Sequence, residues 1–106
     1  MPDKRIFKMH AEVCKALAHG LRIEIIDILQ NRELGFGEIS KKTGVAKSSL
    51  SQHLSVMADK GILMQRKEGL NSYYKLSTPK VAEACRLMRE VLVERLEKQK
   101  DLLKNF

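Results

Sequence analysis

Residues 44–54, GVAKSSLSQHL, carry the most informative pattern in this chain. A short helical pattern over residues 37–42 precedes them and is closed by Thr43-Gly44, because glycine readily ends a helix. A second helix is predicted over about residues 48–60 and is ended by Gly61. Its apolar positions fall on one face and are Leu50, Leu54, Met57 and Ala58. Two short helices joined by so tight a turn form a helix-turn-helix pair, whose second member is the recognition helix.

The opposite side of the predicted recognition helix is rich in groups that form hydrogen bonds. An α-helix fits the major groove of DNA, where such groups read base edges. The side chains that we expect there are Ser51, Gln52 and His53. Lys47 is expected at the start of the helix, beside the backbone amides of Ser48 and Ser49, which suit a phosphate. Two alternatives stay open: Ser48 can act as the N-cap, and Gln52 and His53 can lie on a solvated face.

Residues 62–77 predict a β-hairpin with a basic first strand. Two extended runs, 62–67 and 72–76, surround a turn in which Gly69 and Asn71 suit a positive φ. Such a hairpin can lie along the DNA backbone or the minor groove next to the recognition helix. It would then be the wing of a winged helix.

Four side chains of this wing are candidate DNA contacts. Arg66 and Lys67 are expected at its base, where they would meet phosphates. Asn71 and Tyr73 are expected to add polar contacts at or near its tip. Tyr74 alternates with Tyr73 along the strand, so we expect it to face the core.

Helical patterns flank the helix-turn-helix pair and the hairpin. The first, over about residues 3–18, has Asp3 as a possible N-cap and one apolar face; the second, Leu21 to Gln30, is apolar on most sides and therefore central. Thr78-Pro79 starts a long last helix, about residues 79–103. Its apolar stripe comprises Val81, Ala84, Cys85, Met88, Val91, Leu92, Leu96, Gln99 and Leu103. A stripe of this length needs a cover, so we expect the chain to form oligomers.

The composition fits one small basic domain over residues 1–106, with 20 Lys+Arg against 13 Asp+Glu and a formal charge of +7. Residues 36–79 contain seven basic and three acidic side chains, which suits a polyanion, with nucleic acid ahead of a membrane. No apolar run approaches a membrane span, and the first residues lack the apolar core of a signal peptide. We therefore expect a cytoplasmic protein with no membrane partner.

These elements predict a mainly α-helical fold with a small β-hairpin, in the order of a dimeric winged helix-turn-helix protein that binds DNA. A Gly-rich phosphate loop, a cluster of paired carboxylates and histidines at metal-ligand spacing are all missing from the sequence, so we expect neither an enzyme nor a cofactor. Two competing functions stay open. One is an architectural DNA binder without an effector, and the other is a winged-helix module used for protein interaction.

Three motifs resemble the ArsR/SmtB family of bacterial repressors. They are Cys14-Lys-Ala-Leu-Ala-His-Gly-Leu-Arg-Ile-Glu-Ile-Ile26, the 44–54 segment with its Ser-Gln-His-Leu core, and Gly61-Ile-Leu followed by Arg66-Lys-Glu-Gly and Tyr73-Tyr74. The resemblance extends from about residue 13 to residue 96. It implies a winged-helix homodimer whose first and last helices form the interface. It also implies an operator that is an imperfect inverted repeat and an inducer that weakens DNA binding.

The family's metal sites are not matched. Arsenic-sensing members have Cys-Val-Cys before the helix pair, where this chain has Gly35-Phe36-Gly37. Zinc-sensing members place Asp and His ligands on the last helix, but this chain has no histidine after His53. The resemblance therefore implies no metal site of either type and leaves the inducer unknown.

Cys14 and Cys85 are the remaining candidates for effector chemistry. Both lie on the apolar faces of helices that the family uses for dimerisation, and His10 lies one turn before Cys14. Three interpretations stay open: the cysteines are buried core residues, they form a switch for oxidants or reactive sulfur, or they bind a thiophilic metal or metalloid. Operator sequence, target genes and the sign of regulation are not predicted.

Overall fold

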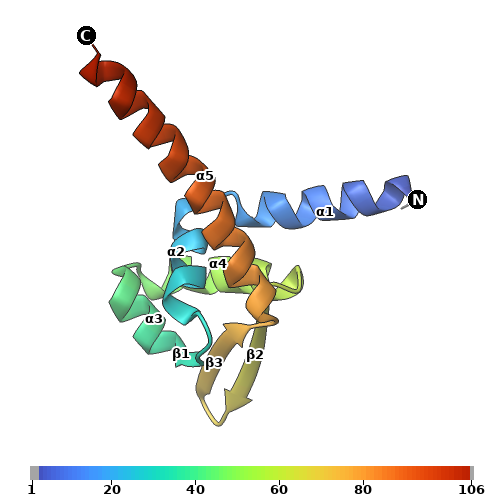
Figure 1. The fold of residues 1–106 in the computed structure, drawn as a ribbon. Coiled ribbons are helices and arrows are strands. Elements are labelled where there is room, and N and C mark those ends of the chain that lie inside the picture. Colours follow the sequence, from blue (N-terminus) through green and yellow to red (C-terminus); the bar gives the residue numbers. More distant parts are fainter. Residues whose placement is uncertain (1–2, 106) are drawn as a thin grey trace.

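The structure is a computed structural model that describes residues 3–105 as five helices and three strands (Figure 1). In chain order these elements are α1 (Lys4–Leu17), α2 (Gly20–Leu29), β1 (Leu34–Gly35), α3 (Phe36–Thr43), α4 (Lys47–Asp59), β2 (Leu63–Glu68), β3 (Asn71–Leu76) and α5 (Pro79–Lys104). The predicted mainly α-helical winged helix-turn-helix architecture is confirmed. The ends of the helices lie within one or two residues of the predicted positions.

The turn between α3 and α4 is held by local hydrogen bonds. Gly44 adopts a left-handed conformation, with φ of 73°, that glycine reaches without steric cost. The hydroxyl of Ser40 then donates to the carbonyl of Val45 at 2.8 Å. Helix α4 begins at Lys47 after Ala46, which forms no side-chain cap. The interpretation of Ser48 as the N-cap is therefore wrong, because this serine already lies in the first turn.

The wing is a two-stranded hairpin with a third, very short strand beside it. The strand order is β1-β3-β2, all antiparallel, and Glu68 pairs with Asn71 next to the turn. Gly69 takes the positive φ of this turn at 61°, whereas Asn71 is the first residue of β3, so the expectation of a positive φ at Asn71 is wrong. Strand β1 was not predicted, since a pair of residues has no periodicity to detect.

The core is formed mainly by one face of α4, most of α2 and the inner side of the sheet. Its buried hydrophobic residues are Ala16, Ile25, Ile26, Leu29, Leu34, Ile39, Leu50, Leu54, Met57, Ile62, Leu63, Tyr74 and Leu76. Helix α2 is central, as predicted. Tyr74 is buried, which confirms its predicted inward position.

Helices α1 and α5 extend from this core in different directions (Figure 1). Helix α5 contains 26 residues and is about 39 Å long at 1.5 Å per residue. None of its residues is fully buried, and Ala16 is the only fully buried residue of α1. Large apolar side chains are exposed on both helices: Ile6, Phe7, Met9, Val13, Leu87, Met88, Val91, Leu92, Val93, Leu96, Leu102 and Leu103. Within residues 3–105, no helix combines the length and apolar character needed to cross a membrane.

Truncation of Leu54 should destabilise the fold strongly. Leu54 is fully buried on the inner face of α4, so Leu54→Ala removes buried methyl groups and leaves a cavity. We expect the free energy of unfolding to fall by about 2 to 5 kcal/mol. Leu70→Ala is the matched control, because Leu70 is fully exposed at the wing turn and its loss should change this energy by less than about 0.5 kcal/mol. Urea unfolding at one fixed chain concentration measures both, and equal losses would contradict this account of the core.

Candidate nucleic-acid interface

The solvent-exposed face of α4 is polar. Its inner face is buried through Leu50, Leu54 and Met57, which fixes the rotation of the helix about its axis. The side chains that this rotation exposes are Lys47, Ser48, Ser49, Ser51 and Gln52. Since Ala46 forms no side-chain cap, the first backbone N–H groups of α4 stay available to an outside acceptor. This face can therefore meet both phosphates and base edges.

His53 differs from these neighbours, because its ring turns toward the junction of α1 and α2. It is half-buried, and its Nδ1 accepts a hydrogen bond from Nε of Arg22 at 3.1 Å. The ring of His19 lies edge-on to it, with 5.7 Å between the ring centroids. Burial is the main cause that lowers the pKa of His53 from 6.5, and the charges of Arg22 and His19 lower it further. At neutral pH the ring is neutral.

The wing holds Arg66 in a network of its own. Its guanidinium forms ion pairs with Glu33 at 2.8 Å and with Glu68 at 2.7 Å, and it lies over the ring of Tyr73 at 4.5 Å from the centroid. Hydrogen bonding to Arg66 lowers the pKa of Glu33, and bonding to both carboxylates raises the pKa of Arg66. In the register of the hairpin, Arg66 lies opposite Tyr73 and Lys67 lies opposite Ser72. The next pair is the one beside the turn, so both basic residues lie close to the tip. The predicted place of Arg66 and Lys67 at the base of the wing is therefore wrong.

Two of the three other wing candidates are exposed and lie outside the Arg66 network. Lys67 and Asn71 are exposed close to the turn, and Lys67 forms no ion pair within residues 3–105. Asn71 lies beside the turn, as predicted. Tyr73 is half-buried beneath Arg66, so its aromatic face is already occupied. Of the four predicted wing contacts, Lys67 and Asn71 are thus the two that are exposed and lie outside the Arg66 network.

The two cysteines occupy different environments, and both are free thiols. Cys14 is exposed on α1, while Cys85 is half-buried and lines a groove of about 350 Å³ between α2 and α5. Burial raises the pKa of the Cys85 thiol, which reduces its thiolate fraction at neutral pH. Ile26, Asp27 and Gln30 line the α2 side of this groove. A thiol switch at these cysteines stays a prediction.

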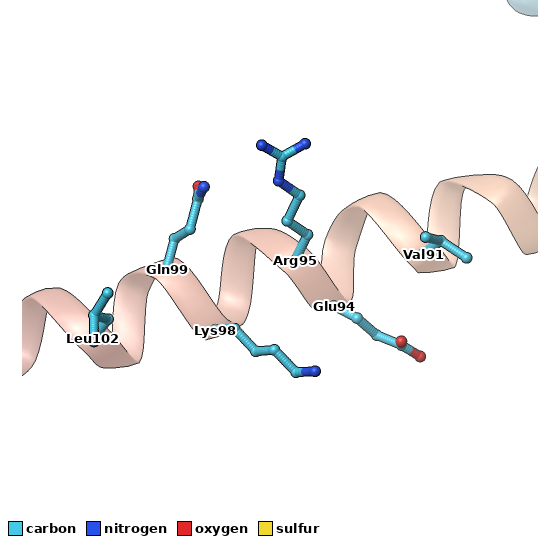
Figure 2. Close-up of a pocket in the computed structure, with 6 residues that line it drawn as sticks. All are labelled: Val91, Glu94, Arg95, Lys98, Gln99 and Leu102. Carbon is cyan, nitrogen blue, oxygen red and sulfur yellow. The ribbon is translucent and has the colours of Figure 1, made fainter.

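A second hollow lies on the outer part of α5 (Figure 2). It is lined by Val91, Glu94, Arg95, Lys98, Gln99 and Leu102. All six belong to one helix and point outward from it, so the hollow is an open helix surface rather than an enclosed ligand site. No group of three or more His, Cys, Asp or Glu side chains within residues 3–105 is placed to hold a metal ion.

Three residues of the interface were not predicted from the sequence. They are Arg22, His19 and Glu33, which position His53 and Arg66 from distant parts of the chain. Arg22 and His53 are 31 residues apart in the sequence, and Glu33 and Arg66 are 33 apart. No local periodicity connects residues at such separations. The only local signal was Arg22 itself, a charged residue on a helix that is apolar on most sides.

Comparison with known proteins agrees with this geometry. The family described as bacterial regulatory protein, arsR family, matches residues 19–64, which span α2 to the start of β2. The HTH-type transcriptional regulator Rv0081 of Mycobacterium tuberculosis, itself uncharacterised, is 33% identical over 107 residues, covering all of this chain and 94% of the relative. The transcriptional activator HlyU of Vibrio cholerae is 34% identical over 77 residues, covering 73% of this chain and 71% of the relative.

Solved structures of relatives share the fold. The crystal structure of Rv0081 superposes with a TM-score of 0.80 at 34% identity, covering 89% of this chain and 95% of that one. A homodimeric winged helix-turn-helix DNA-binding domain from Mycobacterium bovis gives a TM-score of 0.80 at 31% identity, covering 92% of this chain and 93% of that domain. The chain therefore belongs to the arsR family of bacterial regulatory proteins and is a DNA-binding transcriptional regulator.

Proposed function

We propose that this regulator is a homodimeric repressor that binds an inverted-repeat operator through α4 and the wing. The observation that carries the proposal is the face of α4, where polar side chains are exposed directly opposite a fully buried apolar face. Ser51 and Gln52 would read base edges in the major groove. Lys47 and the amides of Ser48 and Ser49 would bind a phosphate at the start of the helix.

The wing would add contacts beside the recognition helix. Lys67 and Asn71 are exposed polar groups close to the turn and carry no negative charge, so they would meet the backbone or the minor groove. Arg66 and Tyr73 would not contact DNA in the way that the sequence predicted. Arg66 forms an ion pair with Glu33 and stacks on Tyr73, which supports a role in bracing the wing and no direct part in binding phosphate.

The apolar faces of α1 and α5 support the dimer. Exposed side chains such as Phe7, Met88 and Leu92 would be covered by the same helices of a second copy. The relative from Mycobacterium bovis is described as homodimeric. Two recognition helices in such a dimer must meet major grooves about 34 to 36 Å apart, which accounts for an inverted repeat.

Repression would follow from occupancy of a promoter by the DNA-bound dimer. The relative HlyU carries the name activator, so a promoter–reporter measurement with and without the chain tests the sign of regulation. Such a regulator would act in the cytoplasm, where bacterial DNA lies. Burial disfavours the Cys85 thiolate, so a reactive thiol at this position gains no support from the site, whereas Cys14 is exposed.

Selection of duplexes from a random-sequence library tests specific DNA binding. We expect the wild type to enrich an inverted repeat and Gln52→Ala to lose discrimination of about 1 to 3 kcal/mol at one base pair of each half-site. Lys47→Gln should weaken binding to all sequences and lower the slope of log affinity against log salt by about 0.9 per chain. Lys104→Gln, at the far end of α5, is the control and should leave the slope unchanged. Enrichment of no sequence would contradict specific operator binding and favour the architectural alternative.

A pair of matched variants separates bracing from phosphate binding in the wing. Lys67→Gln and Arg66→Gln each remove one positive charge from the same strand, β2. Lys67→Gln should lower the salt slope by about 0.9 per chain, because Lys67 would release a counterion on binding. Arg66→Gln should leave that slope nearly unchanged, since its charge is already paired with Glu33 and Glu68. If both variants lower the salt slope by the same amount, Arg66 binds a phosphate instead.

Substitution on α5 should weaken the dimer. Leu92 is about half exposed on a helix without a fully buried residue, so Leu92→Ser should raise the dissociation constant by at least about tenfold. Sedimentation equilibrium over a range of concentrations measures this constant against the 12.1 kDa chain mass. Leu70→Ser is the control, since it makes the same change at an exposed leucine on the wing. A wild type that sediments as a monomer would contradict the proposed assembly.

A further inference from the structure

The guanidinium of Arg22 joins three helices at one point. Arg22 lies in the first turn of α2, and one of its terminal nitrogens donates to the carbonyl of Ala16 in the last turn of α1 at 2.9 Å. Its Nε donates to Nδ1 of His53 in α4 at 3.1 Å. The last carbonyls of a helix have no partner within the helix, so Arg22 stabilises the end of α1 while it contacts the recognition helix.

The contact determines which nitrogen of His53 carries the proton. An N–H group that donates to Nδ1 needs the lone pair of that atom, so the proton of the neutral ring lies on Nε2. Nε2 has no hydrogen-bond partner among the described residues, where Arg22 supplies the only hydrogen bond to this ring. Among the described residues that are not exposed, every buried side-chain nitrogen or oxygen has a hydrogen-bond partner. Nε2 of His53 has no such partner, so this atom is not buried. It is therefore accessible to solvent as an N–H donor.

We propose that Arg22 is a specificity-determining residue that acts by position: it fixes His53 as a solvent-accessible Nε2–H donor next to the exposed Gln52 of α4 and ties this donor to the end of α1. The inference rests on the proposed binding of DNA through α4. In the major groove, an N–H donor selects the acceptors of guanine, adenine N7 or thymine O4 and meets no acceptor on the amino group of cytosine. A histidine free to adopt either tautomer would accept from cytosine as well.

Arg22 also connects the recognition helix to a helix that carries an exposed apolar face. Of the α1 residues, Ala16 is fully buried and Leu17 is partly buried against the core, so α1 meets the core through its last turn. A change in the direction of α1 would therefore act directly on the carbonyl that Arg22 holds. The same guanidinium would transmit that change to His53.

The surroundings of the ring favour the neutral form that this contact requires. Arg22 approaches from α2 and His19 from the α1–α2 junction, and both lower the pKa of His53 below 6.5 in addition to the larger effect of burial. A protonated ring would carry a hydrogen on Nδ1 and lose the bond from Arg22. The arrangement is thus consistent only with a neutral ring.

Nitrogen-15 NMR of the histidine rings in the full chain tests the assignment without DNA. At pH 7.5 we expect His53 of the wild type as one tautomer, protonated on Nε2. Arg22→Met should give a mixture of tautomers and a higher pKa of His53 in a pH titration. Arg32→Met is the matched control, because Arg32 donates to the carbonyl of Ile28 near the end of α2 and, among the described residues, forms no hydrogen bond or ion pair with α4. It should leave the His53 signals and pKa unchanged, which separates the proposed role from a general cost of removing an arginine that caps a helix.

Library selection then tests the effect on base readout. His53→Ala identifies the base pair that His53 reads, as the position that loses enrichment. At that position the wild type should prefer a base with a hydrogen-bond acceptor in the major groove over cytosine. Arg22→Met should reduce this preference about fivefold, which corresponds to the loss of one hydrogen bond. Arg32→Met should retain the full preference. Equal loss in both arginine variants, or selection of cytosine by the wild type, would overturn the proposal.

The two arms separate failure of this inference from failure of the proposed function. A His53 ring protonated on Nδ1 in the wild type overturns the assignment of Arg22, even when the chain selects an operator. That measurement needs no variant, so it decides even where Arg22→Met does not fold. A wild type that enriches no sequence overturns the proposed function, and with it the readout of a base by His53.

Discussion

Burial of one face of α4 is the constraint on which the rest of the structure depends. Leu50, Leu54 and Met57 are fully removed from solvent, and no rotation of the helix keeps them there while turning its polar side inward. Burial of side chains of this size contributes about 1.5 to 3 kcal/mol each, more than any single exposed hydrogen bond. The hydrophobic core therefore fixes which side chains face outward. Ser51 and Gln52 are presented to solvent as a consequence of packing, before any DNA is present.

Electrostatic interactions then divide the basic residues into two groups. Arg22 and Arg66 are engaged within the chain, where a planar guanidinium can donate to two partners at once. Lys47 and Lys67 form no ion pair within residues 3–105 and remain exposed. The net positive charge of the middle of the chain is thus carried outward mainly by lysines. This division explains why counting basic residues predicts a polyanion partner yet does not predict which of them meets phosphate.

Helices α1 and α5 add a second requirement, which a single chain does not satisfy. Their apolar side chains stay exposed, and α1 meets the core only through its last turn. A second copy would cover these faces and would also set the direction of α1. Because Arg22 joins the end of α1 to His53, assembly and base readout would share one contact. The proposed dimer and DNA interface would thereby be linked through one side chain, Arg22.

Much of the fold follows from local patterns: the helix-turn-helix pair, the hairpin, the long last helix and the inward side of Tyr74 were all predicted. Helical and strand periodicities are local, so a single sequence contains them. The exposed polar face of α4 was predicted for the same reason, as the complement of its apolar face. The roles of His53 and Arg66 were not, because they depend on Arg22 and Glu33, more than thirty residues away. Strand β1 likewise exists through pairing with β3. Such contacts arise only when the chain has folded, since their partners are brought together by the packing of the core.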